Sequence, residues 1–208
     1  MKSFFTACLF FSVSSVMANT VELTPAIDKD SDNVTVETTH TLYFSLGQAY
    51  LDSEKSTAEG VEDSALSIRI AWEGSRDSWV FGAGLSGLIY SDNRDFNQSV
   101  VDQFGNYSSA SSDAQSVSLF GEVGYRYTLS QQATVEFLGG YEAVMSSSRS
   151  ISNCSNCLSE DIELDSGMFI GPRVTYRWSN GVKVYLLWNQ HLSGDIESNI
   201  MLSLGLKI

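Results

Sequence analysis

The sequence is poor in residues that rigidify or cross-link a chain and poor in basic residues. Two prolines, Pro25 and Pro172, and three cysteines occur among its 208 residues. No linker-like stretch separates two cores, so we expect a single domain. Lys plus Arg number 12 against 25 Asp plus Glu. Because phosphate recognition along a nucleic acid depends on clustered cations, nucleic acid is not an expected partner, and no pattern predicts a cofactor.

A long apolar run is also missing, except for a short one at the N-terminus. Met1-Lys2-Ser3-Phe4-Phe5 opens it with one positive charge, and Val16-Met17-Ala18 closes it on a small residue. This pattern predicts a cleaved signal peptide over residues 1–18. No segment has the ~20 consecutive apolar residues of a transmembrane helix. Residues 19–38 are acidic and polar, which predicts a flexible periplasmic tail with little to bury.

The cysteines that follow the predicted cleavage site are Cys154 and Cys157, because Cys8 leaves with the signal peptide. They lie in a Ser/Asn-rich stretch of an exported chain, where an oxidising compartment favours a local disulfide. No second pair of ligands lies nearby to complete a zinc site, so no metal is predicted. Idle thiols are the alternative, and a redox motif at a helix start is not indicated.

Period-2 alternation recurs along the chain and predicts strands with two unlike faces. The clearest example has Leu66, Ile68, Ile70 and Trp72 on one face and Ala65, Ser67, Arg69 and Ala71 on the other. Similar runs fall near 40–51, 79–90, 116–128, 133–145, 168–178, 182–191 and 200–208. Each is close to the ~9 to 11 residues with which a tilted strand crosses a bilayer. Eight crossings result.

The connections between these runs alternate between tight and long. Tight turns are predicted over 73–78, 130–132 and 179–181, the last with the Asn-Gly hairpin signal. Long polar segments are predicted over 52–64, 91–115 and 146–166, and a shorter one near 192–197. Short periplasmic turns and longer extracellular loops are typical of outer-membrane barrels. The sequence therefore predicts an all-β fold, a closed eight-stranded antiparallel transmembrane barrel with an up-and-down meander, over residues 39–208.

The two faces of the runs differ as a lipid face and a lumen face should. The apolar face carries no charge along the runs, and its aromatic residues gather near the strand ends, which predicts a girdle at each interface. The predicted girdle residues are Trp72, Trp79, Tyr125, Tyr127, Tyr176, Trp178, Tyr141 and Trp188. The opposite face is rich in Gly and Ser, which suits a narrow interior filled by its own side chains. A soluble lipocalin-like barrel, with an apolar interior, is the disfavoured alternative.

Most strand charges fall on the predicted lumen face. We expect them to form a polar network of Arg69, Glu122, Arg126, Glu136, Glu142, Arg173, Arg177, Lys183 and Lys207. Arg126 and Glu136 fall almost opposite each other across a tight turn, which predicts a cross-strand ion pair. One interpretation is a satisfied polar interior, since buried charges must be paired. The alternative is a narrow pore or ion-conducting barrel.

The whole mature chain resembles the small eight-stranded outer-membrane proteins of the OmpA-barrel and OmpX-like type. This resemblance rests on the repeated alternation and the loop lengths, with no diagnostic motif. It implies outer-membrane lipid and lipopolysaccharide as partners, the barrel-assembly machinery and periplasmic chaperones during biogenesis, and a monomer in the cell outer membrane. In such proteins the last strand usually ends in an aromatic residue, whereas this chain ends in Ile208.

A possible catalytic group is His191-Leu192-Ser193 with Glu197 close behind. A Ser within reach of a His that a carboxylate orients is what nucleophilic catalysis needs. The group resembles the His-x-Ser pair and Glu of the lipid A deacylase PagL, whose site faces lipid. The alternation instead places His191 on the lumen side, so a rim His and a turn Ser are the preferred interpretation, and no catalytic residue is predicted.

The predicted extracellular segments are acidic, with Glu54, Glu59, Glu62 and Asp63 in the first, Asp92, Asp95, Asp102 and Asp113 in the second, and Glu160, Asp161, Glu163 and Asp165 in the third. A solvated rim explains them, and divalent-cation binding is the alternative. We therefore expect a non-enzymatic protein with a structural or surface-interaction role, such as membrane stabilisation, adhesion or ligand contact. A pore and a lipid A hydrolase are the alternatives.

Overall fold

The computed structural model describes residues 38–92, 99–101, 104–105, 107–109, 111–152, 159–179 and 181–208. The predicted signal peptide, most of the predicted tail, and Cys154 and Cys157 lie outside these ranges. The elements are β1 (Thr38–Leu51), α1 (Ser53–Glu59), β2 (Val61–Arg76), β3 (Trp79–Asp92), β4 (Ser99–Val101), β5 (Tyr107–Ser109), β6 (Ser111–Thr128), β7 (Ala133–Ser152), β8 (Ser159–Asp161), β9 (Gly167–Arg177), β10 (Lys183–His191) and β11 (Ile196–Lys207). No helix in the described ranges is long and apolar enough to cross a bilayer.

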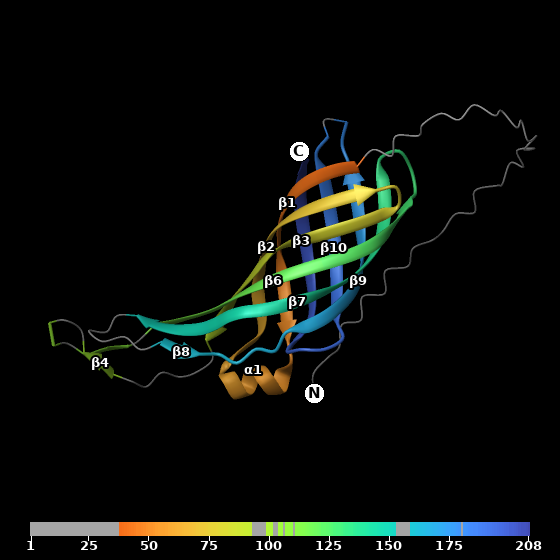
Figure 1. The fold of residues 1–208 in the computed structure, drawn as a ribbon. Helices are drawn as coiled ribbons and strands as arrows, with labels where there is room; N and C mark the ends of the chain where they lie inside the picture. The colour runs from red at the N-terminus through yellow and green to blue at the C-terminus, as the bar shows by residue number, and fades with distance from the viewer. Residues whose placement is uncertain are drawn as a thin grey trace, which may run out of the picture. The chain divides into compact units, whose positions relative to one another are not determined.

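The eight long strands close into a barrel (Figure 1). Consecutive long strands pair antiparallel, in the order β6-β3-β2-β1-β11-β10-β9-β7, and β6 pairs with β7. The first and last strands also pair, with Ser45 opposite Ser203. Every long strand thus has a neighbour on both sides, which satisfies its backbone groups without an open sheet edge. The predicted closed eight-stranded meander is confirmed.

The two faces of the wall alternate in phase with the sequence pattern. Outward side chains along the middle of the strands are apolar and exposed, for example Ile70 at 56%, Leu85 at 52% and Leu202 at 57%. Inward side chains on the same strands are buried and mostly polar or small, such as Ser45 and Ser67. A wall that is apolar outside and polar inside has the arrangement required for contact with lipid. The predicted phase of the strands is correct.

One rim of the barrel, here called the short-turn rim, consists of three tight turns together with both ends of the barrel sheet. The described residues of its turns are 77–78, 129–132, and 178–179 with 181–182. The first turn was predicted to begin at Glu73, which is wrong. β2 continues to Arg76, which pairs with Trp79, and the reversal needs only Asp77 and Ser78. Asp77 adopts a positive φ of 53°, as a two-residue hairpin turn requires.

The opposite rim, here called the long-loop rim, is more structured than the predicted polar loops. Residues 53–59 form α1, which begins after Asp52, whose side chain accepts hydrogen bonds from the N–H groups of Glu54 and Lys55. The helix ends at Gly60 with φ 71°, a left-handed cap. β6 and β7 pair out to Ser111 and Ser152, far beyond the last pairing of β7 with β9 at Glu142. β8 adds a short third strand to this extension (Figure 1).

The closed sheet predicts that the barrel resists detergent as a unit. Folded protein loaded without boiling should migrate on a gel differently from boiled protein, because the closed hydrogen-bonded wall stays compact in detergent until it is heated. Membrane fractionation of expressing cells is the companion measurement. A chain that fractionates with soluble periplasmic proteins and shows no heat-dependent shift would contradict the transmembrane assignment.

Candidate functional site in the barrel lumen

Arg173 on β9 is the centre of the lumen. Its side chain is 1% exposed and contacts three carboxylates on three other strands. Nη2 lies 2.5 Å from Glu73 Oε2, and Nη1 lies 3.3 Å from Glu122 Oε1. Nε donates to Glu136 Oε2. A buried guanidinium is stable only when carboxylates surround it with good geometry, so these contacts link β2, β6 and β7 to β9.

Two further cations complete this cluster, which we call the Arg173 cluster. Arg126 Nε lies 2.5 Å from Glu136 Oε1, and its Nη2 lies 3.3 Å from Glu73 Oε1. Lys183 Nζ lies 3.2 Å from the same Glu73 oxygen. The cluster therefore has three cations, Arg126, Arg173 and Lys183, and three carboxylates, Glu73, Glu122 and Glu136. Its formal charge is balanced.

Glu73 is a lumen residue that was not predicted, because the turn was expected to begin there. It receives all three cations of the Arg173 cluster and is 1% exposed. Its position continues the inward phase of Arg69 and Ala71, so the alternation itself carried the signal. Extending β2 by one inward position beyond Ala71 would have placed Glu73 in the lumen.

Above the Arg173 cluster, toward the long-loop rim, lies a second ion pair. Arg69 Nη2 is 2.5 Å from Glu142 Oε2, and both side chains are almost completely buried. The guanidinium also packs over Phe120, 4.5 Å from the ring centroid, and near Phe169 at 5.6 Å. This stacking places the Arg69 charge against aromatic faces, which favour a cation. The second pair is also neutral.

The lumen ends in an apolar plug at the long-loop rim. The plug consists of buried residues Ala49, Leu51, Val61, Ala65, Leu88, Tyr90, Ala114, Ile162 and Ile196, with Leu164 packed against them. Ile162 comes from the segment after β8 and is 4% exposed. Its N–H donates to the carbonyl of Ser147 at 3.1 Å. A loop residue is thus held inside the barrel end, where it replaces water with hydrocarbon.

The predicted lumen residues therefore fall into separate groups. Arg126, Glu136, Glu122, Arg173 and Lys183 meet in the Arg173 cluster, and Arg69 meets Glu142 above it. Arg177 and Lys207 point inward but are exposed at the short-turn rim. They belong to the mouth of the barrel and not to the buried network, because β9 and β11 end at these residues.

The predicted girdle residues are all exposed on the outer wall. Trp79 and Tyr125 make an edge contact with ring centroids 5.6 Å apart, and Tyr125 and Tyr127 make another at 5.0 Å. Tyr176 and Trp178 contact each other similarly at 5.6 Å. These residues, with Trp72, lie close to the short-turn rim, whereas Tyr141 and Trp188 lie further along their strands. Aromatic rings of this kind favour the interface between hydrocarbon and water.

His191, Ser193 and Glu197 do not form a catalytic group in the structure. The His191 ring points inward, is 8% exposed and packs against Phe169 with centroids 5.5 Å apart. Ser193 is exposed, and its hydroxyl accepts a hydrogen bond from the N–H of Met168 at 3.0 Å. No hydrogen bond joins His191 to Ser193 or Glu197 among these described residues. Likewise, the described ranges contain no cluster of three His, Cys, Asp or Glu side chains placed to hold a metal.

A buried arginine also organises the long-loop rim. Arg149, in the extension of β7, is fully buried and lies 2.9 Å from Glu160 of β8. Its Nη2 donates to the carbonyls of Glu59 and Gly60, at 2.6 and 3.3 Å, at the end of α1. One side chain thus holds together α1, β7 and β8. Arg149 lies in the segment 146–166 that was predicted to be a loop, so this role was not predicted.

Replacing Arg173 tests the Arg173 cluster against a matched arginine on the same strand. Arg173→Gln should lower the free energy of unfolding by about 3 to 5 kcal/mol, because three carboxylates lose a buried partner. Arg177→Gln removes the same charge four residues further along β9, at an exposed position, and should stay within about 0.5 kcal/mol of the parent. Urea titration of barrels refolded in detergent measures both. Equal losses would mean that the cluster does not stabilise the barrel.

No protein-family model matches the sequence, and no curated protein sequence matches it. Among solved structures, the chain is similar to Ail, the attachment invasion locus protein of Yersinia pestis, at 11% identity and a TM-score of 0.47, covering 83% of this chain and 99% of that chain. Neisserial surface protein A gives 9% identity, a TM-score of 0.47, and coverage of 82% and 97%. A triple mutant of the Rhodopseudomonas blastica porin gives 11% identity, a TM-score of 0.24, and coverage of 82% and 100%. These TM-scores are below 0.5, so the fold is assigned from the strand pairing of this chain alone.

Proposed function

We propose that the chain is an integral outer-membrane β-barrel that does not conduct ions and has a structural or surface-interaction role at its long-loop rim. The observation that carries this proposal is a lumen blocked by the Arg173 cluster and by the apolar plug, in a barrel whose long-loop rim is ordered, acidic and exposed. A barrel that does not conduct holds the protein in the membrane. Its function then depends on the surface that it exposes to water at the long-loop rim.

The blocked lumen argues against conduction in two ways. In the Arg173 cluster every carboxylate is bound to a cation, so an ion entering there must break charged contacts between almost completely buried side chains. Beyond it, the apolar plug presents mainly hydrocarbon to a hydrated ion, and the Tyr90 hydroxyl of the plug is hydrogen-bonded to Ser116. An eight-stranded barrel has an interior just wide enough for its own side chains, which agrees with this filling.

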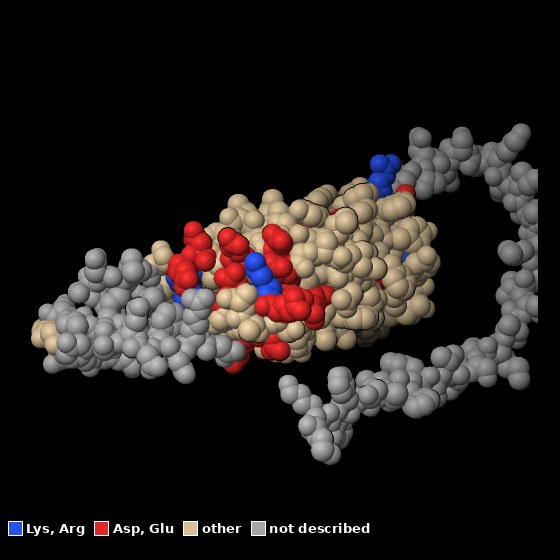
Figure 2. All heavy atoms as spheres, turned by 90° about the horizontal axis from the view of Figure 1, so that it is seen from below, with Lys and Arg blue, Asp and Glu red and all other residues tan. Residues whose placement is uncertain are grey.

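The long-loop rim has a strong acidic character. Its described acidic residues include Asp52, Glu54, Glu59, Glu62, Asp63, Asp113, Glu160, Asp161, Glu163, Asp165, Asp195 and Glu197. The two cations among them are already engaged: Lys55 lies 3.6 Å from Glu59 and 3.9 Å from Asp195, and Arg149 binds Glu160. Figure 2 shows Asp and Glu side chains gathered on one face of the barrel with few Lys or Arg between them. Such a surface favours cationic partners and repels anionic ones.

Planar-bilayer recording tests the absence of conduction. Folded, heat-modifiable protein should give no stable single-channel steps, because both the Arg173 cluster and the apolar plug block the lumen. Boiled protein from the same preparation serves as the control for leakage caused by detergent. Stable steps whose size changes in an Arg173→Gln or Glu122→Gln variant would show that ions pass through the lumen, and would replace this proposal with the pore alternative.

A pair of strains, with and without the chain, separates a surface role from a lipid A hydrolase. The surface role predicts that expressing cells bind a soluble polycation more strongly, and that Glu54→Gln, Glu62→Gln and Glu163→Gln together remove most of the increase. Asp77→Asn, an exposed acid on the short-turn rim, is the control and should leave it unchanged. Lipid A from the two strains should have the same mass spectrum. Loss of an acyl chain that depends on His191 and Ser193 would establish the enzyme instead.

A further inference from the structure

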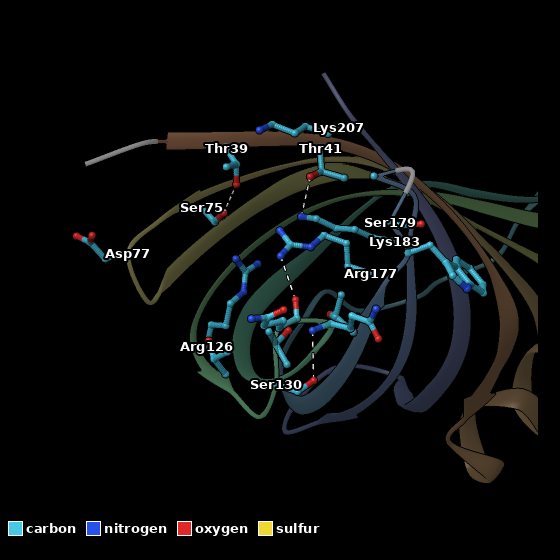
Figure 3. Close-up of a pocket in the computed structure, with 17 residues that line it drawn as sticks. Thr39, Thr41, Ser75, Asp77, Arg126, Ser130, Arg177, Ser179, Lys183 and Lys207 are labelled. Atoms are coloured by element: carbon cyan, nitrogen blue, oxygen red, sulfur yellow. Dashed lines mark hydrogen bonds between the residues drawn. The ribbon is translucent and has the colours of Figure 1, made fainter. Parts of the chain in front are cut away.

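The short-turn rim surrounds an open cavity of about 850 Å³ at the end of the lumen (Figure 3). Its floor is the Arg173 cluster, represented by Arg126 and Lys183, and its walls are the last inward residues of the strands. Figure 3 shows Arg126, Arg177 and Lys183 pointing into this mouth, with hydroxyl groups such as those of Thr41 and Ser75 around them. The lining contains four cationic residues, Arg126, Arg177, Lys183 and Lys207, and one acidic residue, Asp77.

The side chains that line this mouth carry a net positive charge, whereas those of the Arg173 cluster are balanced in charge. Arg126 and Lys183 are neutralised from below by Glu73 and Glu136. Arg177 has no carboxylate within ion-pair distance among the described residues, and its hydrogen bond goes to the carbonyl of Gln131 at 3.1 Å. A positive charge therefore remains on the wall of the cavity.

The strand register places the positive charge of Arg177 next to another positive charge. Arg177 on β9 lies directly opposite Lys183 on β10, and like charges in directly opposed positions destabilise a strand pair. An anion between the two side chains would turn the repulsion into attraction. Arg has five N–H donors in a planar fork, so Arg177 keeps donors for such an anion besides the one used on Gln131.

Two buried hydroxyl groups in the same wall have unused hydrogen-bonding capacity. Thr134 and Thr175 lie opposite each other in the pairing of β7 with β9 and both line the cavity. Thr175 is 5% exposed, and neither Oγ1 atom has a hydrogen-bond partner among the described residues. Buried polar groups normally have partners. Hydroxyl donors beside a guanidinium are suited to a ligand with several acceptor oxygens.

We propose that the short-turn mouth is a binding site for a small molecule that carries a phosphate-class oxyanion. Arg177 would bind two phosphate oxygens with its planar fork, and Thr175 and Thr134 would donate to the remaining oxygens. The cavity opens along the barrel axis and is separated by the wall from lipid headgroups outside, so the ligand enters from the aqueous phase. In the orientation of the proposed function this phase is the periplasm, and binding there is independent of the long-loop rim.

Inorganic pyrophosphate is the probe for this site. Isothermal titration of folded barrel in an uncharged maltoside detergent, at constant ionic strength, should give saturable binding. Arg177→Gln should weaken it about tenfold or more, because hydrogen bonds to charged groups are among the stronger ones. Thr175→Val, at a site that keeps every charge, should weaken it by a smaller factor. Heat-modifiable migration confirms that each variant is folded.

Arg76→Gln is the matched control, because Arg76 is an exposed arginine on the same rim that does not line the cavity. It should leave the dissociation constant within about twofold, as expected for a residue outside the contact. Absence of saturable binding to the parent protein would overturn the proposal. Equal weakening by Arg76→Gln and Arg177→Gln would show diffuse attraction by rim charge, and citrate binding as tightly as pyrophosphate would reject the phosphate class. If Arg177→Gln does not fold, unchanged binding in Thr175→Val overturns the site.

Discussion

The rest of the barrel depends on the pairing of the Arg173 guanidinium with Glu73, Glu122 and Glu136. Eight strands enclose too little space to hydrate a charge, so a cation in the lumen needs carboxylates from other strands. These carboxylates come from β2, β6 and β7, and their geometry is correct only when the sheet has closed in this register. Removing any one partner leaves an uncompensated buried charge. The Arg173 cluster therefore links barrel closure to strand register as well as to charge balance.

The sequence predicted the wall of this barrel better than its ends, for a physical reason. A strand with lipid on one side must alternate apolar and polar side chains along its whole length. This alternation correctly predicted that Ile70 points outward and Arg69 inward. Glu73 was predicted to lie in the turn 73–78, although the alternation of β2 continues through it to Arg76. Asp52 and Gly60 were visible signals for the ends of α1, but no such local signal predicts that Arg149 binds Glu59 and Gly60 carbonyls far away in sequence.

The two rims of the barrel have opposite charge characters, which the overall net charge of −13 conceals. Acidic residues gather at the long-loop rim, while Arg177 and Lys207 lie at the short-turn mouth next to the balanced Arg173 cluster. Charges at the two ends of a barrel this long are more than a Debye length apart at physiological ionic strength. Each rim therefore acts on its own surroundings, and a partner of one rim hardly senses the charge of the other.

Polar side chains in the middle of a lumen do not by themselves form a path for ions. Asn189, Asn199 and His191 have buried polar atoms that find no partner within the described part of the chain, and they line the lumen beyond the Arg173 cluster, with Asn199 opposite Ala49 of the apolar plug. Buried groups of this kind are usually satisfied by ordered water, but such water would be enclosed by ion pairs on one side and by hydrocarbon around Ile162 on the other. An ion would have to cross both boundaries without its hydration shell. The polarity of the middle therefore fits the inward face of a closed sheet, and contact with other molecules is left to the two rims.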